Sequence, residues 1–273
     1  MIMYKDQKIE PSKYAIINWI GFTDFVPERA VTSNWFSTKV FFCIRLILAL
    51  YSTIVLWTDI GVTDNGKFFQ FFTSLTYIGL HSYLITSCVN HFRYIRNKNM
   101  DFMLNQPAVL NYMYMYLYST VITFNIVTPV VYWSLLYGSS TANTTVTVWL
   151  NVSVHAVSFF LMIFDVIMNR MKTPIRMVVF PLITIILFMF LAFIVYACNG
   201  YWIYGFLDWS QGGKAALWYI LVGIICVVGY FFQCLIHWFR DFIARKSGRA
   251  VSQEELNDTS EVDHAKLEAS EIA

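Results

Sequence analysis

The chain has 273 residues, of which 58% are hydrophobic and only 13% are charged. A soluble domain carries about 25% charged residues, so this composition excludes a protein with a fully water-facing surface and makes the bilayer its solvent. The net charge of +2 is too small to indicate a nucleic-acid partner.

The first 39 residues form a predicted cytoplasmic N-terminal region that holds five lysine and arginine residues among interrupted apolar stretches. Within it, the segment from Tyr14 to Phe25 is apolar but too short to cross a membrane. We expect this segment to lie on the membrane surface as an interfacial helix or to cap the helices that follow.

Six segments between residues 40 and 239 are long and apolar enough to span a bilayer. A span needs about 20 residues, because each adds ~1.5 Å against a hydrocarbon core of ~30 Å. The expected spans are Val40–Trp57, Phe68–Val89, Leu117–Tyr137, Thr147–Met168, Met177–Ala197 and Ala215–Phe239. The sequence therefore predicts an all-α fold, a six-helix transmembrane bundle.

Lysine and arginine predict the orientation of this bundle. They gather in the N-terminal region, in the second and fourth loops and just after the last span, whereas the opposite loops hold only Lys67 and Lys214. Because cytoplasmic segments carry the excess of positive residues, both termini are predicted to be cytoplasmic. Residues 240–273 read as a basic and then acidic disordered tail, since the last part is polar and poor in aromatic residues.

His155 is the most informative residue, because an ionisable side chain inside a span is costly and is commonly functional. The second and fourth spans begin on the same side, which places Thr73 ~8 Å and His155 ~12 Å along their helices. A hydroxyl and a base at one depth are the minimum requirement for nucleophilic acyl transfer. Asn151 lies one turn before His155 and could orient the imidazole or stabilise an oxyanion.

Other interpretations of these residues stay open. A membrane threonine commonly bonds the carbonyl one turn back, and Thr76 is an alternative nucleophile close to Thr73. Asp165 lies too far along its helix from His155 to complete a triad. An ion pair between Asp165 and Arg45 is the structural interpretation, and a role in gating is the functional one. No two histidines stand three or four residues apart, so no metal site on one helix is predicted.

Four motifs stand out along the spans. The fourth span contains Trp149-Leu150-Asn151 followed by His155, and Phe71-Phe72-Thr73 opens the second span. The third span ends in the sequence PVVYWSLLY, and the loop after the fifth contains GYWIYGFL. Together these motifs resemble the androgen-induced gene family of multi-pass membrane hydrolases. The resemblance covers residues 66–239 and departs from the family at Ser74, where a bulky apolar residue is usual.

The resemblance implies a threonine-type lipid ester hydrolase that acts on fatty acid esters of hydroxy fatty acids, with Thr73 as nucleophile and His155 as base. No metal or organic cofactor is expected, and the partners are a membrane lipid substrate and the bilayer. A non-enzymatic transporter, receptor or scaffold is the alternative. Short loops without a sorting motif favour the endoplasmic reticulum membrane over the plasma membrane.

Overall fold

The computed structural model describes residues 4–63, 66–137 and 144–250, and within these ranges the chain forms helices and no strand. The N-terminal region contains α1 (Ala15–Ile20), η1 (Phe22–Asp24) and α2 (Pro27–Val31). The long helices and their extensions are α3 (Thr38–Val62), α4 (Phe72–Asn97), α6 (Ala108–Val131) with η3 (Tyr132–Leu136), α7 (Thr145–Val152) with η5 (Ser153–Val157) and α8 (Ser158–Met168), α9 (Val179–Asn199) and α10 (Gly213–Lys246). Shorter elements connect them: η2 (Phe68–Gln70), α5 (Asp101–Leu104), η6 (Ile175–Val178), η7 (Gly205–Leu207) and η8 (Trp209–Gln211).

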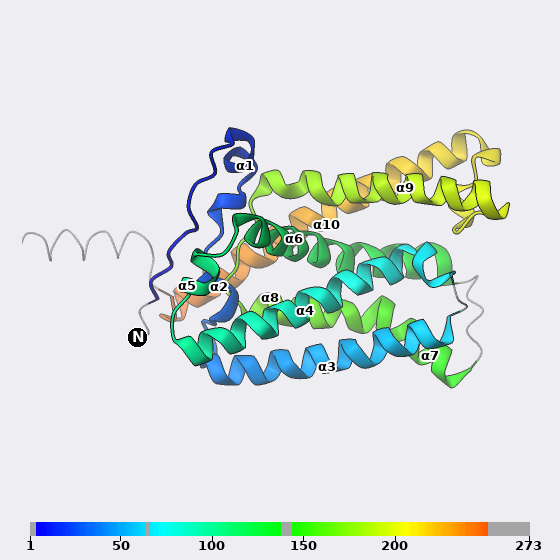
Figure 1. The fold of residues 1–273 in the computed structure, drawn as a ribbon. Helices are drawn as coiled ribbons and strands as arrows, with labels where there is room; N and C mark the ends of the chain where they lie inside the picture. Colours follow the sequence, from blue (N-terminus) through cyan, green and yellow to red (C-terminus); the bar gives the residue numbers. More distant parts are fainter. Residues whose placement is uncertain (1–3, 64–65, 138–143, 251–273) are drawn as a thin grey trace, which may run out of the picture.

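The long helices run alternately up and down in one bundle (Figure 1). Within the described ranges, five of them are long and apolar enough to cross a membrane: Thr38–Val62, Ala108–Leu136, Thr145–Met168, Ile175–Asn199 and Gly213–Lys246. Their outer faces expose large apolar side chains such as Ile47, Leu187 and Ile220, each more than 60% exposed. Contiguous apolar surface of this kind requires a lipid environment.

α4 has a comparable length but is more polar and is not among these five helices. It packs against α3 on one side and α6 on the other (Figure 1). Its polar side chains find partners inside the bundle: His81 Nδ1 lies 3.1 Å from Ser52 Oγ, and Ser87 Oγ lies 2.8 Å from Tyr114 Oη. Protein contacts therefore satisfy some of the polar groups of this helix, whereas the buried Tyr77 hydroxyl and both ring nitrogens of His91 have no hydrogen-bond partner among the described residues.

Several predicted span boundaries are wrong, and the first and second spans end later than predicted, at Val62 and Asn97. The second span begins at Phe72 rather than Phe68, because Phe68–Gln70 form a separate 3-10 turn and Phe71 is extended. The third begins at Ala108 rather than Leu117, because Pro107 starts the helix early. The last continues to Lys246, so residues 240–246 are helical rather than part of a disordered tail, while residues 251–273 lie outside the described part of the chain.

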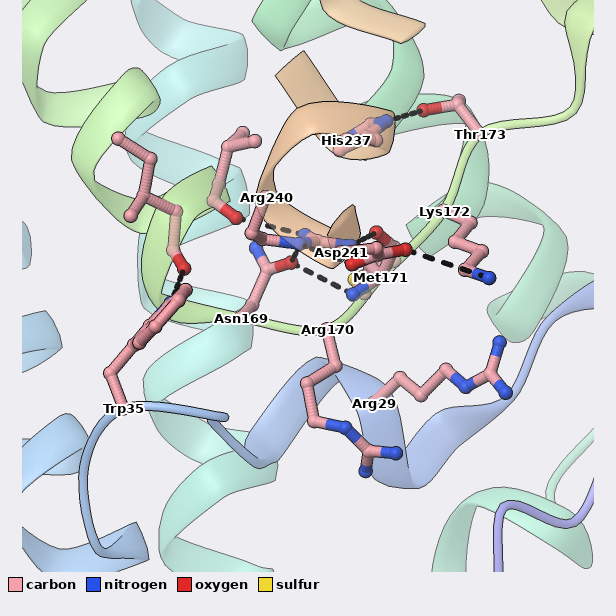
Figure 2. A network of polar contacts seen from close by, with 12 residues as sticks. Arg29, Trp35, Asn169, Arg170, Met171, Lys172, Thr173, His237, Arg240 and Asp241 are labelled. Atoms are coloured by element: carbon pink, nitrogen blue, oxygen red, sulfur yellow. Dashed lines mark hydrogen bonds and ion pairs between the residues drawn. The ribbon is translucent and has the colours of Figure 1, made fainter. Parts of the chain in front are cut away.

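A polar network explains why α10 continues beyond the predicted span (Figure 2). Arg240 is buried and donates hydrogen bonds to the Val166 and Met171 carbonyls at 2.9 and 2.7 Å and to Asn169 Oδ1 at 3.2 Å. His237, also buried, bonds Thr173 Oγ1 at 3.1 Å. These contacts join the end of α10 to the last turn of α8 and to the segment after it.

The N-terminal region covers the same end of the bundle at which α10 finishes (Figure 1). The Phe22 ring packs 5.2 Å from Tyr112 and 5.1 Å from Phe180, measured between ring centroids. The neighbouring α1 instead exposes Ile16 and Trp19. The segment expected either to cap the bundle or to lie on the membrane thus packs on the bundle through η1 and presents apolar residues outward from α1.

Candidate active site

A cavity of about 470 Å³ lies at the end of the bundle opposite the N-terminal region, among α3, α4, η3, α7, η5 and the loop after α9. Thr73, Asn151 and His155 all line it. Further polar wall residues are Asp59, Thr63, Ser74, Tyr132, Thr147 and Tyr204. We call this space the polar cavity. Of the four residues predicted for catalysis or its support, Thr73, Asn151 and His155 therefore line one cavity and Thr76 does not.

Thr73 stands in the first turn of α4, not five residues inside a helix as the sequence predicted. That depth argument is wrong for Thr73, because Phe68–Gln70 form a separate 3-10 turn and Phe71 is extended, so that α4 begins only at Phe72. Its position in the first turn instead places Thr73 near backbone N–H groups that lack intrahelical partners, where the helix dipole favours negative charge.

Thr76 lies outside the cavity wall. Its hydroxyl donates a 2.9 Å hydrogen bond to the carbonyl of Thr73, the internal bond that threonines commonly form in membrane helices. Of the two threonines, Thr73 is the one whose side chain lines the polar cavity.

His155 is 7% exposed and lies in η5, a π-helical turn of the kind that often marks functional positions. The Tyr132 ring stacks on the imidazole with centroids 3.6 Å apart and planes 3° from parallel. The Trp133 indole donates a 3.1 Å hydrogen bond to the His155 carbonyl. Among the described residues His155 Nδ1 has no hydrogen-bond partner, although it is buried. Tyr132 therefore holds the imidazole ring and Trp133 holds the backbone of His155, while Nδ1 has no hydrogen-bond partner among the described residues.

Tyr204 is a wall residue to which the sequence analysis gave no role. It comes from the loop after α9, and its hydroxyl oxygen accepts a 3.0 Å hydrogen bond from the Phe72 N–H. Burial raises the pKa of Tyr204 to about 12, and hydrogen bonds from Phe72 and Thr73 oppose that rise. The phenol is therefore protonated at neutral pH, directly beside Thr73. Tyr204 belongs to the GYWIYGFL motif, but the sequence alone does not show that this loop returns to α4.

Asp59 is a second wall residue that the sequence analysis passed over. It lies near the end of α3, and its Oδ1 accepts a 3.1 Å hydrogen bond from the Thr63 hydroxyl. Spacing along the fourth span directed attention to Asp165 alone, whereas Asp59, from a different helix, is a carboxylate that shares a cavity with His155.

A second space of about 240 Å³ adjoins the polar cavity, and we call it the apolar chamber. Its walls come mainly from α6, α9, α10 and η7, and most of its lining residues are aliphatic or aromatic. Thr73, Tyr132, Leu136 and Tyr204 line both spaces. Thr73 therefore stands at the junction between a polar and an apolar space.

Arg45 and Asp165 are completely buried and form a two-pronged ion pair away from both spaces. Arg45 Nε donates to Asp165 Oδ1 at 2.7 Å, and Nη2 donates to Oδ2 at 3.1 Å. Tyr83 donates a further 2.7 Å hydrogen bond to Oδ2, and Arg45 Nη1 donates to the Ala30 carbonyl at 2.8 Å. These contacts give Asp165 a structural role that joins α3, α4 and α8.

The five helices of the described chain that are long and apolar enough to cross a membrane define a multi-pass integral membrane protein. Within that class, the chain belongs to the family described as FAR-17a/AIG1-like protein, whose family model matches residues 32–237. This match confirms the resemblance drawn from the sequence motifs. Searches against characterised proteins and against solved structures gave no match.

Proposed function

We propose that this protein is an intramembrane hydrolase of lipid esters, with Thr73 as nucleophile and His155 as general base. The observation that carries the proposal is the shared wall: a half-buried threonine hydroxyl and a buried imidazole from different helices line one cavity. Threonine is a weak nucleophile until a base takes its proton, so this pairing has a chemical purpose. Family membership supports the same reaction and, through the resemblance, fatty acid esters of hydroxy fatty acids as substrates.

The chemistry needs only groups of the protein and one water. The Thr73 oxygen attacks the ester carbonyl carbon while His155 accepts the hydroxyl proton. The tetrahedral intermediate collapses, the C–O bond to the leaving alcohol breaks, and His155 returns the proton to that alcohol. Water, deprotonated by His155, then attacks the acyl-threonine ester, which releases the fatty acid and restores the Thr73 hydroxyl.

Three groups are suited to stabilise the negative oxygen of the intermediate. The first turn of α4 supplies backbone donors and the positive end of a helix dipole. Tyr204 supplies a protonated phenol next to Thr73. Asn151 supplies an amide from the cavity wall. Removing a single oxyanion donor typically costs about 100- to 1000-fold in rate, which makes each contribution measurable.

For the membrane arrangement we propose six spans with α4 as the second, and both termini in the cytoplasm. The N-terminal region and the end of α10 occupy one end of the bundle (Figure 1), and Arg249 Nη1 donates to the Trp35 carbonyl at 3.3 Å. An even number of crossings places both at the same membrane surface. The lysine and arginine bias assigns that surface to the cytoplasm. The endoplasmic reticulum is the membrane we propose.

Hydrolysis of long-chain esters by the purified full-length protein tests the enzymatic proposal. Thr73→Ala and His155→Ala should each remove activity, and Thr73→Ser should retain part of it because the hydroxyl remains. Thr76→Ala is the matched control and should stay close to wild type, since its hydroxyl is occupied within α4. Full activity in Thr73→Ala would exclude this nucleophile. A wild-type protein inert toward every ester would instead favour a transporter, receptor or scaffold.

A further inference from the structure

Asp59 is a charged residue whose presence the packing of the bundle does not explain. It lies in the last turn of α3, a helix long and apolar enough to cross the membrane, where an ionisable side chain is costly and is commonly functional. A negative charge there also lies at the negative end of the helix dipole, so it does not stabilise α3. Arg45, deeper in the same helix, is neutralised by Asp165. Asp59 forms no ion pair with any described residue.

The carboxylate of Asp59 is available to a molecule in the polar cavity. Within the described part of the chain it accepts one hydrogen bond, from the Thr63 hydroxyl to Oδ1 at 3.1 Å. An ionised carboxylate has about four acceptor positions on its two oxygens. Because Asp59 is half-buried and lines the polar cavity, its free acceptor positions can serve a bound molecule there.

The packing of α3 against α4 places this carboxylate next to the proposed nucleophile. The two helices run in opposite directions (Figure 1), and Ser52 Oγ on α3 lies 3.1 Å from His81 Nδ1 on α4. About two helical turns further along α3 lies Asp59, and about two turns back along α4 lies Ser74. Two turns return a side chain to the same helix face, so Asp59 and Ser74 face each other as the first pair does. Both line the polar cavity with Thr73, the neighbour of Ser74.

We propose that Asp59 binds the water that hydrolyses the acyl-threonine. The inference rests on the proposed hydrolase function and assigns a residue to the second half of its reaction. The water donates one hydrogen bond to Asp59, and His155 takes its other proton as the water oxygen attacks the acyl carbon. The bond between that carbon and Thr73 Oγ then breaks, His155 returns the proton to Oγ, and the fatty acid leaves. Asp59 stays a carboxylate throughout.

The two halves of the reaction make different demands on the cavity. In the first half the nucleophile is Thr73, which the chain itself holds in place. In the second half it is a free water, and a misplacement of about 1 Å can cost about 100-fold in rate. The polar cavity of about 470 Å³ has room for several waters, each of which fills about 30 Å³ in the liquid. An ionised carboxylate only accepts hydrogen bonds, so it binds a water, which donates them, rather than an ester group, which has none to donate.

Asp59→Asn tests the proposal in the full-length protein, because it keeps the shape of the side chain and replaces a carboxylate oxygen by a donor. With a p-nitrophenyl ester it should give a stoichiometric burst of p-nitrophenol and then a steady rate about 100-fold below wild type. Mass spectrometry should find the acyl group accumulated on Thr73. Labelling by a fluorophosphonate probe needs no water, so it should keep its wild-type rate and show that the variant is folded.

Asp208→Asn is the matched control. Asp208 lies in the loop after α9, accepts a 2.9 Å hydrogen bond from the Ser210 N–H and lines neither space. The same substitution there should leave both labelling and turnover at wild-type rates. A second variant, Asp59→Ala, tests the role of the carboxylate by chemical rescue. Added formate should restore part of its turnover, which it would not do if Asp59 only supported the fold.

The outcomes separate this inference from the function on which it rests. Turnover by Asp59→Asn at the wild-type rate, equal losses of labelling and turnover, or no response of Asp59→Ala to formate would overturn the role of Asp59 alone. A loss that changes with the leaving alcohol and leaves no acyl group on Thr73 would also overturn it, and would place Asp59 at the leaving alcohol instead. Wild-type protein that neither labels nor hydrolyses any ester would refute the hydrolase proposal and this inference with it.

Discussion

The buried Arg45–Asp165 pair allows a quantitative test of how the bundle is held together. Both side chains are 0% exposed and joined by two hydrogen bonds. Asp165→Ala leaves a buried guanidinium that keeps its hydrogen bond to the Ala30 carbonyl but has lost its counter-ion, and Arg45→Ala leaves a buried carboxylate. Breaking a buried pair from one side typically costs about 3–5 kcal/mol, which lowers the melting temperature by roughly 6–20 °C in a protein of this size.

The double variant Arg45→Ala/Asp165→Ala should cost less than the sum of the single variants, because it leaves no unpaired buried charge. The Tyr83 hydroxyl and Asn169 Nδ2 still lose their acceptor and the Ala30 carbonyl loses its donor, and the loss at Tyr83 costs about 1–3 kcal/mol. Adding Tyr83→Phe should recover part of that loss. Thermal unfolding in detergent, followed by size-exclusion chromatography, gives the stability of the wild type, the two single variants, the double variant and the double variant with Tyr83→Phe.

The exposed pair Lys8–Asp24 is the control for this cycle, because its bond is equally short at 2.8 Å but its side chains are 61% and 55% exposed. Lys8→Ala should change stability by at most about 1 kcal/mol. Additive costs of Arg45→Ala and Asp165→Ala in a double-mutant cycle would mean that the two residues do not interact, and would refute the structural role assigned to them.

Three further predictions concern the site and the topology. Tyr204→Phe should lower ester hydrolysis by roughly 10- to 1000-fold with unchanged expression, because it removes the phenol beside Thr73; an unchanged rate would remove Tyr204 from the site. Asn151→Ala should lower kcat over a similar range with a smaller change in KM, if its amide acts on the transition state. Tags at both termini should be digested by protease added to sealed microsomes, and protection of either tag would overturn the six-span arrangement.

Periodicity and hydropathy predicted the long helices, but the sequence could not locate the start of α4. The residue that caps this helix is Phe71, whose side chain makes no capping hydrogen bond, so the usual polar signal is missing. The sequence FFQFF from Phe68 to Phe72, in which Gln70 is the one polar residue, is then indistinguishable from the start of a helix. The predicted end of the last span is wrong for a different reason. Arg240 has the charge expected at the start of a polar tail, but it is buried and donates hydrogen bonds to carbonyls in the last turn of α8 and just after it.

The candidate site was predictable in part. Thr73, Asn151 and His155 were selected by residue type and position within the predicted spans, and all three line one cavity. Tyr204 could not be selected in the same way, because its place depends on how the loop after α9 returns to α4. Tyr132, whose ring stacks on His155, lies in a π-helical turn. Such a turn shifts side chains away from the positions that regular helical spacing predicts.

The most direct measurement of the central claim is the position of a covalent adduct. Wild-type protein in native membranes is treated with a fluorophosphonate probe, digested, and analysed by mass spectrometry. The adduct should lie on Thr73 and should be absent after His155→Ala, because the hydroxyl then lacks the base that activates it. An adduct on Thr76 or on any other residue, or labelling that survives His155→Ala, would contradict the proposed Thr73–His155 dyad.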